Sequence, residues 1–561
     1  MEIIMKNIFR PKIVDSLKGY SGKMLVSDLV AGVIVAIIAL PLSIALAIAS
    51  GVPPVMGICT AIIAGFVISL LGGSRVNISG PTAAFATIVA GIVAQFGVQG
   101  LVLATVMAGI MLVLMGIFRF GSLIKYIPIT ITTGFTSGVA VTIVIGQLKD
   151  FFGLTFAEGT HAVETTEKLV AAVRSFATLN PWALLVGAVG LAILIVWPML
   201  GKVGKKVPGS LIAVIVGALL VMLLGHFGIE VATIGSTFGT LKGSFDAFNF
   251  PEAIDLDLIL ALLPSAFTIA ILAAIESLLS CVVSDGMIGD RHNSNTELIA
   301  QGLGNVCSGL FGGIPATGAI ARTAANVKNG GRSPISGMVH AAVLLAVLFL
   351  LMPYASLIPM PMIAAILFMV AYNMCEWRSF VKLCRTAPLA DIVVLVVTFV
   401  LTVVFDLVVA IAVGMVLAVV FFMKRMADNA KIRAWQRSED SRFKHLPERV
   451  AVFEIDGPMF FASAEKFSDL PIEDGCRVLI LRMHNVPALD ATATKNLFSV
   501  LKTCREKNIT LLLAHVNDQP LSVMKRAGFV GEVGEENFLP NIDIALARAE
   551  ELCATEKVSV D

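Results

Sequence analysis

The chain has 561 residues and a formal net charge of +1, and 57% of its residues are hydrophobic whereas only 14% are charged. Soluble domains carry about 25% charged residues, so this chain has too few to cover a water-facing surface. That excludes an ordinary soluble enzyme and a disordered protein. The near-zero net charge excludes a nucleic-acid binder, which would need a basic excess, so no nucleic acid is expected as a partner. A membrane protein fits this composition.

The charges are unevenly spread along the chain. Residues 424–561 hold 19 Lys or Arg and 21 Asp or Glu, about three tenths of that segment, whereas residues 1–423 hold 22 and 19, about a tenth. The contrast predicts a long membrane region followed by one small soluble domain. The expected parts are a cytosolic N-terminal segment at 1–23, a transmembrane domain at 24–425, a linker at 426–445 and a small domain at 446–556.

The membrane region reads as a series of apolar stretches, each near the length of about 20 residues that a helix needs to cross a bilayer. These lie at 28–49, 54–72, 99–118, 126–147, 180–199, 208–228, 258–284, 296–312, 333–353, 357–374, 389–406 and 407–423. Two further segments, 76–96 and 314–328, are rich in Gly, Pro, Ser and Thr. Counting both gives about 14 membrane segments.

Positive residues flank the membrane region on both sides. They are Lys6, Arg10, Lys12, Lys18 and Lys23 before it, and Lys424, Arg425, Lys431 and Arg433 after it. Positive flanks stay in the cytoplasm, so an even number of spans places both termini there. The first 23 residues lack the apolar stretch and cleavage site of a signal peptide. We expect a multi-pass protein of the cell membrane, in contact with lipid, with both termini cytoplasmic.

The membrane region shows weak internal symmetry. GGSRVNISGPTAA at 72–84 and GGIPATGAIARTAA at 312–325 share a Gly-Gly lead, a short extended stretch and small residues that open a helix. Two halves of seven segments, at about 24–228 and 258–425, would have opposite orientation because seven is odd. Inverted halves with a broken helix in each are typical of transporters with a site near the midplane.

The two broken helices predict an anion site. A helix that begins at membrane depth exposes free N–H groups and the positive end of its dipole, which must face a cavity or a ligand. Such an end binds anions. The alternative is a Gly-rich kink that serves only close packing. The residues that open the helices are Thr82 and Ala83 in one, and Thr317, Gly318, Ala319, Ala321 and Arg322 in the other.

Two charged residues stand out in this apolar region. A charge at membrane depth costs about 3 kcal/mol or more, and Arg322 cannot escape by losing its proton. It should bind an anionic substrate, pair with a carboxylate or reach the interface. Glu276, the only acidic residue in its apolar stretch, is a proton carrier or the ion-pair partner of Arg322. His340 is expected to be a hydrogen-bonded packing residue rather than a relay.

The last region alternates strand and helix. Short apolar runs at 450–455, 477–483 and 509–514 predict strands, and amphipathic stretches at 493–507, 519–528 and 541–554 predict helices. This order in a small domain predicts a sheet with helices packed on it.

Several of these stretches resemble the sulfate permease family, also called solute carrier family 26. They are ALPLSIALAIASGVPPVMGICTAIIAG at 39–65, GGSRVNISGPTAAFA at 72–86, TELIAQGLGN at 296–305, IPATGAIARTAANV at 314–327 and SPISGMVHA at 333–341. The resemblance covers almost the whole chain and is nearest to the bacterial branch that includes the dicarboxylic acid transporter of enteric bacteria. It implies 14 segments in two inverted seven-segment repeats, with a core and a gate subdomain.

The resemblance also implies roles for individual residues. The anion would lie between the third and tenth segments, with Thr82 opening the third, and Ala321 and Arg322 in the tenth. Leu42 and Leu46, which follow the helix-bending Pro41 at a four-residue spacing, take first-segment positions that are often Gln and aromatic in animal members. By themselves they read as ordinary packing. Glu276 matches an eighth-segment acidic position associated with proton coupling.

The C-terminal region resembles the STAS domain of these transporters and of anti-sigma-factor antagonists. Its loop PALDATAT at 487–494 lies where the antagonists carry a phosphorylatable hydroxyl, which makes Thr492 a candidate regulatory residue. The alternative role for Thr492 is a helix N-cap. The same face would suit a cytosolic protein partner.

The resulting expectation is a proton-coupled secondary active transporter of small anions, working by alternating access. Sulfate is the family's default substrate; the alternatives are a C4-dicarboxylate symporter for succinate, fumarate or aspartate, a bicarbonate transporter, and an anion channel or sensor. The resemblance also implies a homodimer, because members of the family are often dimers. The sequence has no GxSxG, Walker-type loop or metal-ligand spacing, and its 8 cysteines form no C-x-x-C pair, so it predicts no enzyme, no metal and no cofactor.

Overall fold

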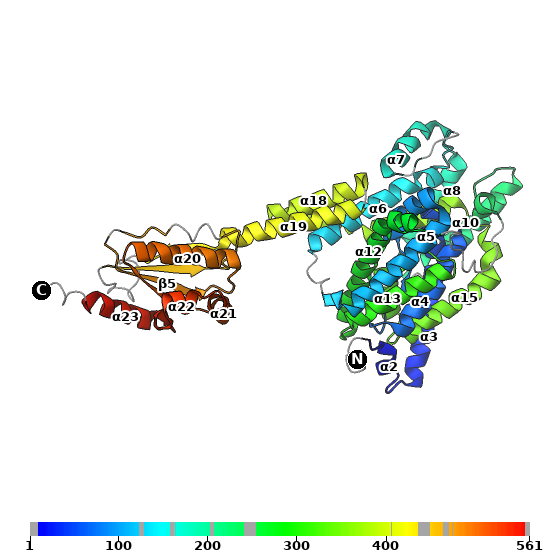
Figure 1. The fold of residues 1–561 in the computed structure, drawn as a ribbon. Helices are drawn as coiled ribbons and strands as arrows, with labels where there is room; N and C mark the ends of the chain where they lie inside the picture. Colours follow the sequence, from blue (N-terminus) through cyan, green and yellow to red (C-terminus); the bar gives the residue numbers. More distant parts are fainter. Residues whose placement is uncertain are drawn as a thin grey trace. The chain divides into compact units, whose positions relative to one another are not determined.

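The computed structural model of the chain describes residues 9–122, 128–157, 162, 164–201, 207–239, 254–405, 407–435, 449–463, 470–473 and 475–555 (Figure 1). The chain folds as two compact units, Met1–Met415 and Val416–Asp561. We call them the membrane unit and the C-terminal unit, and describe each by itself.

Long apolar helices build the membrane unit. Ten helices of the described residues are long and apolar enough to cross a membrane. They are built on α3 (Gly22–Ala49), α4 (Pro54–Leu71), α5 (Ala86–Ile117), α6 (Ile129–Phe152), α8 (Pro181–Val196), α10 (Gly209–His226), α12 (Leu256–Ile288), α15 (Ile335–Ala355), α16 (Met360–Met374) and α19 (Leu407–Asn429), of which α19 runs on into the C-terminal unit. An eleventh apolar helix, α18 (Leu389–Val404), is shorter.

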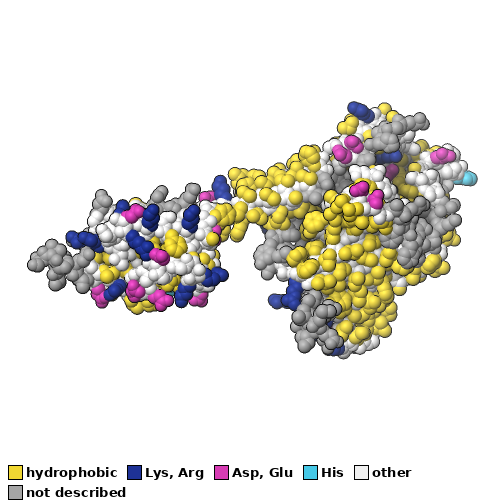
Figure 2. Space-filling model, in the orientation of Figure 1, with side chains coloured by type: hydrophobic (Ala, Val, Ile, Leu, Met, Phe, Trp, Pro, Cys, Tyr) yellow, Lys and Arg dark blue, Asp and Glu magenta, His cyan; other side chains and the backbone are white. Residues whose placement is uncertain are grey.

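Hydrophobic side chains cover much of the visible face of the membrane unit (Figure 2). Leu219 and Met222 on α10, for example, are 61% and 57% exposed. A water-soluble domain rarely shows so continuous an apolar surface, whereas helices that meet lipid require one. The polytopic helical membrane protein predicted from composition is confirmed.

A glycine divides α5 into two arms. Gly97 has φ 69° and ψ −176°, a backbone conformation that side chains with a Cβ atom rarely adopt. The helix therefore turns at this residue. The arms on its two sides correspond to the segments predicted at 76–96 and 99–118.

The broken helices predicted from the Gly-Gly repeats lie next to each other. Strands β1 (Ser79–Gly80) and β2 (Thr317–Gly318) form an antiparallel pair, with Ser79 opposite Gly318 and Gly80 opposite Thr317. The 3₁₀ turn η1 (Ala83–Phe85) follows β1 and leads into α5, and α14 (Ile320–Lys328) follows β2. Two segments about 240 residues apart in sequence are thereby joined through backbone hydrogen bonds.

Close glycine contacts lock α13 (Ser294–Leu310) against its neighbours. A Cβ atom at Gly109 of α5 would lie 2.7 Å from the Gly302 carbonyl oxygen, and one at Gly302 would lie 2.5 Å from that of Gly109. At Gly304 a Cβ atom would lie 2.5 Å from the Ile68 side chain of α4. Small residues that let helix backbones approach are the usual packing device in membranes.

Shorter helices complete the membrane unit: α2 (Lys12–Ser16), α7 (Thr165–Arg174), α11 (Ile234–Phe238) and α17 (Trp377–Thr386), with the 3₁₀ turns η3 (Phe176–Thr178) and η4 (Trp197–Met199). Proline opens several of the membrane helices. Pro54, Pro181 and Pro361 lie in the first turns of α4, α8 and α16, where a missing N–H leaves no helical bond unmade.

The C-terminal unit is a five-stranded sheet with helices on both faces. Its strand order is β3-β4-β5-β6-β7, with β3 antiparallel to β4 and the other pairs parallel. The elements are β3 (Lys431–Ala434), β4 (Val450–Asp456), β5 (Val478–Asn485), α20 (Ala491–Glu506), β6 (Thr510–Ala514), α21 (Asp518–Arg526), α22 (Phe529–Val533), η7 (Glu535–Asn537), β7 (Phe538–Leu539) and α23 (Ile542–Thr555).

Alternating side chains of β5 explain why helices cover both faces of this sheet. Leu479 and Leu481 pack in one hydrophobic cluster with α20, and Val478 and Ile480 pack in another with α23. The three predicted strands and three predicted helices are confirmed. Strand β3 lies within the predicted linker, and β7 and α22 were not predicted.

Candidate anion-binding site

Two helix N-termini without side-chain caps meet through the β1–β2 pair. The turn η1 has Thr82 as its N-cap and α14 has Ala319, both in extended conformations and neither with a side-chain cap hydrogen bond. Because each follows directly on one strand of the pair, the strands bring both N-termini to one place. Their N–H groups are suited to binding an anion.

Arg322 crosses from one broken helix to the other. It is the third residue of α14 and is 2% exposed, and its Nη2 donates to the carbonyl oxygen of Pro81 at 3.0 Å. A Cβ atom at Gly80 would lie 2.6 Å from Nη1, so the guanidinium occupies space that only glycine leaves open. Within the described residues, Nε and Nη1 have no hydrogen-bond partner. The positive charge therefore lies directly beside the opening of the first helix.

Glu276 approaches the site from α12. Its Oε2 accepts a hydrogen bond from the Thr82 hydroxyl at 3.0 Å, at the N-cap of η1. The structure shows no ion pair between Glu276 and Arg322 among the described residues. The alternative in which these two residues neutralise each other is thus not found. The carboxylate of Glu276 and the N-terminus of η1 therefore share Thr82 as a neighbour.

Thr317 and Gly318 attach the second broken helix to α12. Thr317 is fully buried, donates to the Ala273 carbonyl oxygen at 3.1 Å and bonds the Ser277 hydroxyl at 2.8 Å. The Gly318 N–H donates to the same Ser277 oxygen at 3.0 Å. The Thr317 hydroxyl is therefore engaged with α12, and both residues position the N-terminus of α14.

The remaining predicted site residues lie on the two broken helices and on α3. Ala83 is buried and Ala321 is exposed. On α3, which packs against both α14 and α5, Leu46 is 2% exposed and Leu42 is partly buried against the same hydrophobic core. The structure thus brings the helix of Leu42 and Leu46 to the two broken helices.

His340 lies behind β1. It is fully buried on α15, and neither ring nitrogen has a hydrogen-bond partner among the described residues. A Cβ atom at Gly65 of α4 would lie 3.2 Å from the Ser79 carbonyl oxygen and 3.7 Å from the His340 Nδ1. The prediction of a hydrogen-bonded packing histidine is wrong in this respect.

A buried polar network beneath the strands was not predicted. Asn77 Oδ1 accepts from Ser280 at 2.7 Å and from Thr323 at 3.0 Å, and its Nδ2 donates to Glu297 at 2.8 Å. The network joins α12, α13 and α14. A signal was present in the sequence: within 296–305, Glu297, Gln301 and Asn305 recur every four residues.

In the C-terminal unit, Thr492 lies exposed in the first turn of α20. The N-cap of this helix is Asp490, whose carboxylate accepts from the N–H groups of Ala493 and Phe461, both at 2.8 Å. The N-cap role considered for Thr492 is therefore wrong, and its hydroxyl is on the surface.

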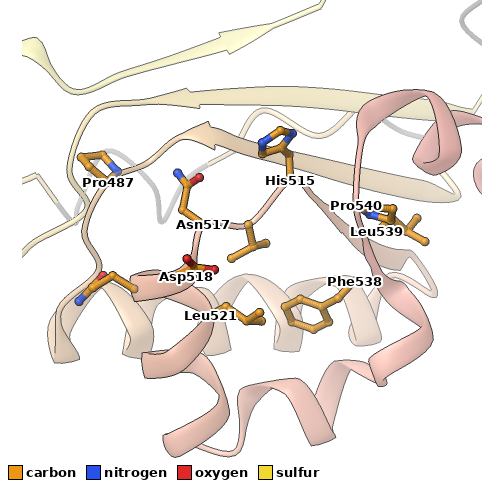
Figure 3. A pocket seen from close by; sticks show the side chains of 10 residues that line it. Pro487, His515, Asn517, Asp518, Leu521, Phe538, Leu539 and Pro540 are labelled. Carbon is orange, nitrogen blue, oxygen red and sulfur yellow. The ribbon is translucent and has the colours of Figure 1, made fainter.

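A cleft of about 740 Å³ opens at the carboxyl ends of the parallel strands, where α/β domains commonly bind ligands (Figure 3). It is lined by Pro487, His515, Val516, Asn517, Asp518, Gln519, Leu521, Phe538, Leu539 and Pro540. Gln519 accepts from the Leu489 N–H at 2.8 Å and donates to the Leu489 carbonyl oxygen at 3.2 Å. The cleft therefore shares a wall with the loop at 487–494.

Comparison with known families gives two matches along the chain. Residues 25–398 match the sulfate permease family, and residues 444–545 match the STAS domain.

Full-length relatives agree with these matches. The Bacillus subtilis protein named "Putative sulfate transporter YvdB" is 40% identical, over 94% of this chain and 98% of its own length. The bicarbonate transporter BicA of a Picosynechococcus strain is 29% identical, over 93% and 94%.

Solved structures show the same fold. The transmembrane domain of a cyanobacterial BicA matches with a TM-score of 0.63 at 30% identity, over 70% of this chain and 98% of that chain. The murine Slc26a9 anion transporter matches with a TM-score of 0.87 at 18% identity, over 98% and 95%. With a helical membrane unit, an α/β C-terminal unit and relatives that are named transporters rather than enzymes, the chain belongs to the sulfate permease family and is a membrane transporter with a C-terminal STAS domain.

Proposed function

We propose that the protein is a secondary active transporter that binds a small anion between the N-termini of η1 and α14. The observation that carries this proposal is the convergence of two uncapped helix N-termini, through β1 and β2, beside the buried Arg322.

The electrostatics of these elements favour an anion. Each helix N-terminus carries roughly half a positive charge, although the short α14 supplies less, and Arg322 adds a full one. Among the described residues the Arg322 side chain makes one hydrogen bond, to Pro81, so its Nε and Nη1 donors are left for a ligand. Backbone N–H groups and a guanidinium recognise negative charge and oxygen acceptors rather than one chemical identity. The site would thus accept several small anions.

Glu276 supports proton coupling. Its carboxylate bonds Thr82, the N-cap of η1, so a negative Glu276 opposes an anion bound at that N-terminus. Protonation removes the opposing charge. Proton binding and anion binding would then strengthen each other, and this coupling is reciprocal.

The hydrophobic clusters support alternating access between a core and a gate. A large cluster spans α3, α4, α5, α12 and α15, the helices around the site, and takes in one side of α6 and α16. A second cluster joins α8 and α10 to other residues of α6 and α16, so these two helices lie between the two groups. Rocking of one helix group against the other around a fixed midplane site is the usual transport motion of inverted-repeat folds.

Sulfate is the first substrate to test because a full-length relative is named as a sulfate transporter. Bicarbonate is the second because two relatives at about 30% identity are named bicarbonate transporters. C4-dicarboxylates are the third, on the resemblance in the sequence alone.

The test is uptake into proteoliposomes. Radiolabelled sulfate, bicarbonate and succinate are offered with and without an inward proton gradient, and each unlabelled anion then competes with the best tracer. We expect uphill accumulation of at least one anion and loss of uptake in Arg322→Ala. Unitary currents without accumulation would instead identify a channel, and no uptake of any anion would refute the proposal.

Replacing Glu276 separates binding from coupling. Glu276→Gln keeps the size of the side chain and can still accept from Thr82, but it cannot exchange a proton. We expect anion exchange to persist while accumulation driven by the proton gradient is lost. Exchange and gradient-driven uptake are measured on the same vesicles. Unchanged accumulation would remove Glu276 from proton coupling.

A further inference from the structure

One face of α13 carries four polar side chains that are buried, and burying polar groups costs free energy unless they are hydrogen-bonded. Glu297, Gln301, Asn305 and Ser308 are each fully buried. Their spacing of four, four and three residues places them on one side of the helix. We call these four residues the α13 polar stripe.

The first half of the stripe binds the segment that leads to β1. Glu297 accepts hydrogen bonds from the N–H groups of Gly73 at 2.9 Å and Ser74 at 3.2 Å. One turn further on, Gln301 donates to the Ser79 hydroxyl at 2.9 Å. A buried carboxylate is tolerated when several donors surround it, and here most of those donors lie on a single loop.

The second half of the stripe binds the segment that leads to β2. Asn305 Oδ1 accepts from the Ala316 N–H at 2.8 Å, and its Nδ2 donates to the Ala316 carbonyl oxygen at 2.9 Å. Ser308 donates to the Ile314 carbonyl oxygen at 2.8 Å. Asn305 thus pairs with backbone as a neighbouring strand would.

The segments that lead to β1 and β2, which we call the lead-in segments, contact different halves of α13. The segment before β1 contacts the N-terminal half, and the segment before β2 contacts the C-terminal half. Glu297 and Ser308 are 11 residues apart, which corresponds to about 16 Å along a helix. The glycine contacts of Gly302 with α5 and of Gly304 with α4 leave α13 little freedom to slide.

We propose that the α13 polar stripe positions the N-termini of η1 and α14 relative to each other and so sets the affinity for the anion. This inference rests on the proposed function. Its four side chains are positioning residues: they touch the lead-in segments rather than the ligand. Hydrogen-bond donors that are already fixed in position bind a ligand with a smaller loss of conformational entropy. Loosening these donors should therefore raise KM more than it lowers kcat.

The experiment measures KM and kcat of anion uptake in the full-length protein carrying Asn305→Asp or Ser308→Ala. The aspartate oxygen replaces the amide donor and faces the carbonyl oxygens of Ala316 and Gln301. We expect a KM rise of about tenfold for Asn305→Asp and about threefold for Ser308→Ala, with kcat within about twofold of wild type.

The matched control is Thr105→Val. Thr105 is also fully buried and lies on α5. Its hydroxyl donates a hydrogen bond to the Leu101 carbonyl oxygen of the same helix. We expect its KM to stay within about twofold of wild type.

Hydrogen exchange gives a readout that does not depend on transport. In Asn305→Asp the new carboxylate oxygen repels the Ala316 carbonyl oxygen, so this segment should loosen and the Ala316 amide should exchange faster. In Glu297→Gln the Gly73 and Ser74 amides should exchange faster, because a side-chain NH₂ group replaces one of the two acceptor oxygens. Slow exchange as in wild type, or an unchanged KM in folded variants, would overturn the role of the stripe. If the larger substitutions prevent folding, Ser308→Ala decides. Failure of the wild-type protein to transport any anion would refute the proposed function, while the exchange data would still test the stripe.

Discussion

Arg322 brings a permanent charge to membrane depth, at a cost of about 3 kcal/mol or more, and recovers one hydrogen bond from the described protein groups. A purely structural arginine at so buried a position should have all its N–H groups hydrogen-bonded, because each buried unpaired donor costs further free energy. Two unpaired guanidinium nitrogens are understandable where a ligand completes the set.

Gly80 is the residue that makes room for this guanidinium. In Gly80→Ala the new Cβ atom would lie 2.6 Å from Nη1, so the guanidinium must shift, and we expect this shift to weaken its bond to Pro81. We expect a fall of at least tenfold in kcat/KM, corresponding to about 1.4 kcal/mol.

Gly91→Ala is the control, since a Cβ atom at that position meets nothing within 4 Å. Uptake by both variants is compared per molecule of reconstituted protein. Equal activity of the two would show that the position of the guanidinium does not matter.

At the scale of single residues, the sequence predicted which charged side chains are costly to bury, but not which groups they hydrogen-bond. Arg322 and Glu276 stood out because charge is rare in an apolar stretch. That Glu276 bonds Thr82 rather than Arg322 depends on the rotation of α12 about its axis, which no local pattern encodes. Glu297 was passed over because it sits among other polar residues near the start of its helix.

At the scale of secondary-structure elements, the two-residue strands β1 and β2 hold the two helix N-termini together. Strands β1 and β2 are far too short to be stable alone, so their pairing depends on side chains from neighbouring helices. On one side α12 contributes Ser277, and on the other α13 contributes its polar stripe.

Ser277→Ala should loosen β2 from α12. The Gly318 N–H would lose its acceptor and Thr317 one of its partners, and a buried unsatisfied donor costs about 1–3 kcal/mol. We expect a lower thermal midpoint and a higher KM for the anion.

Ser284→Ala on the same helix is the matched control for that substitution. Ser284 is equally buried, but among the described residues its hydroxyl donates to the Cys281 carbonyl oxygen of α12 itself. Thermal unfolding and uptake are measured on all three proteins. A KM that changes equally in both variants would argue against a specific role of Ser277.

The elements themselves were largely predictable. The lengths of the apolar stretches predicted the membrane helices, and the Gly-Gly pairs and Pro81 indicated the broken ones. Short apolar runs predicted the strands of the C-terminal unit. The antiparallel pairing of β1 with β2 was not derivable, because it joins segments about 240 residues apart through backbone groups that every sequence shares. Strand β3 was missed because its side chains are largely exposed.

At the scale of the whole molecule, each unit has a hydrophobic core of its own. The clusters of the membrane unit draw on residues 36–371, and those of the C-terminal unit draw on residues 430–549. All the residues of the proposed anion site lie in the membrane unit. The uneven charge along the sequence reflects this division, since only the C-terminal unit needs a surface that water wets.

Removing the C-terminal unit should therefore leave the anion site intact. A chain truncated after Asn429 keeps α19 whole and removes β3, which would otherwise lose its pairing with β4. We expect less protein in the membrane but a KM within about twofold of wild type for each molecule counted by a fluorescent N-terminal tag. A tenfold change in KM would mean that the C-terminal unit acts on the site, and Thr492 and the cleft beside loop 487–494 would then be the first places to search for the cause.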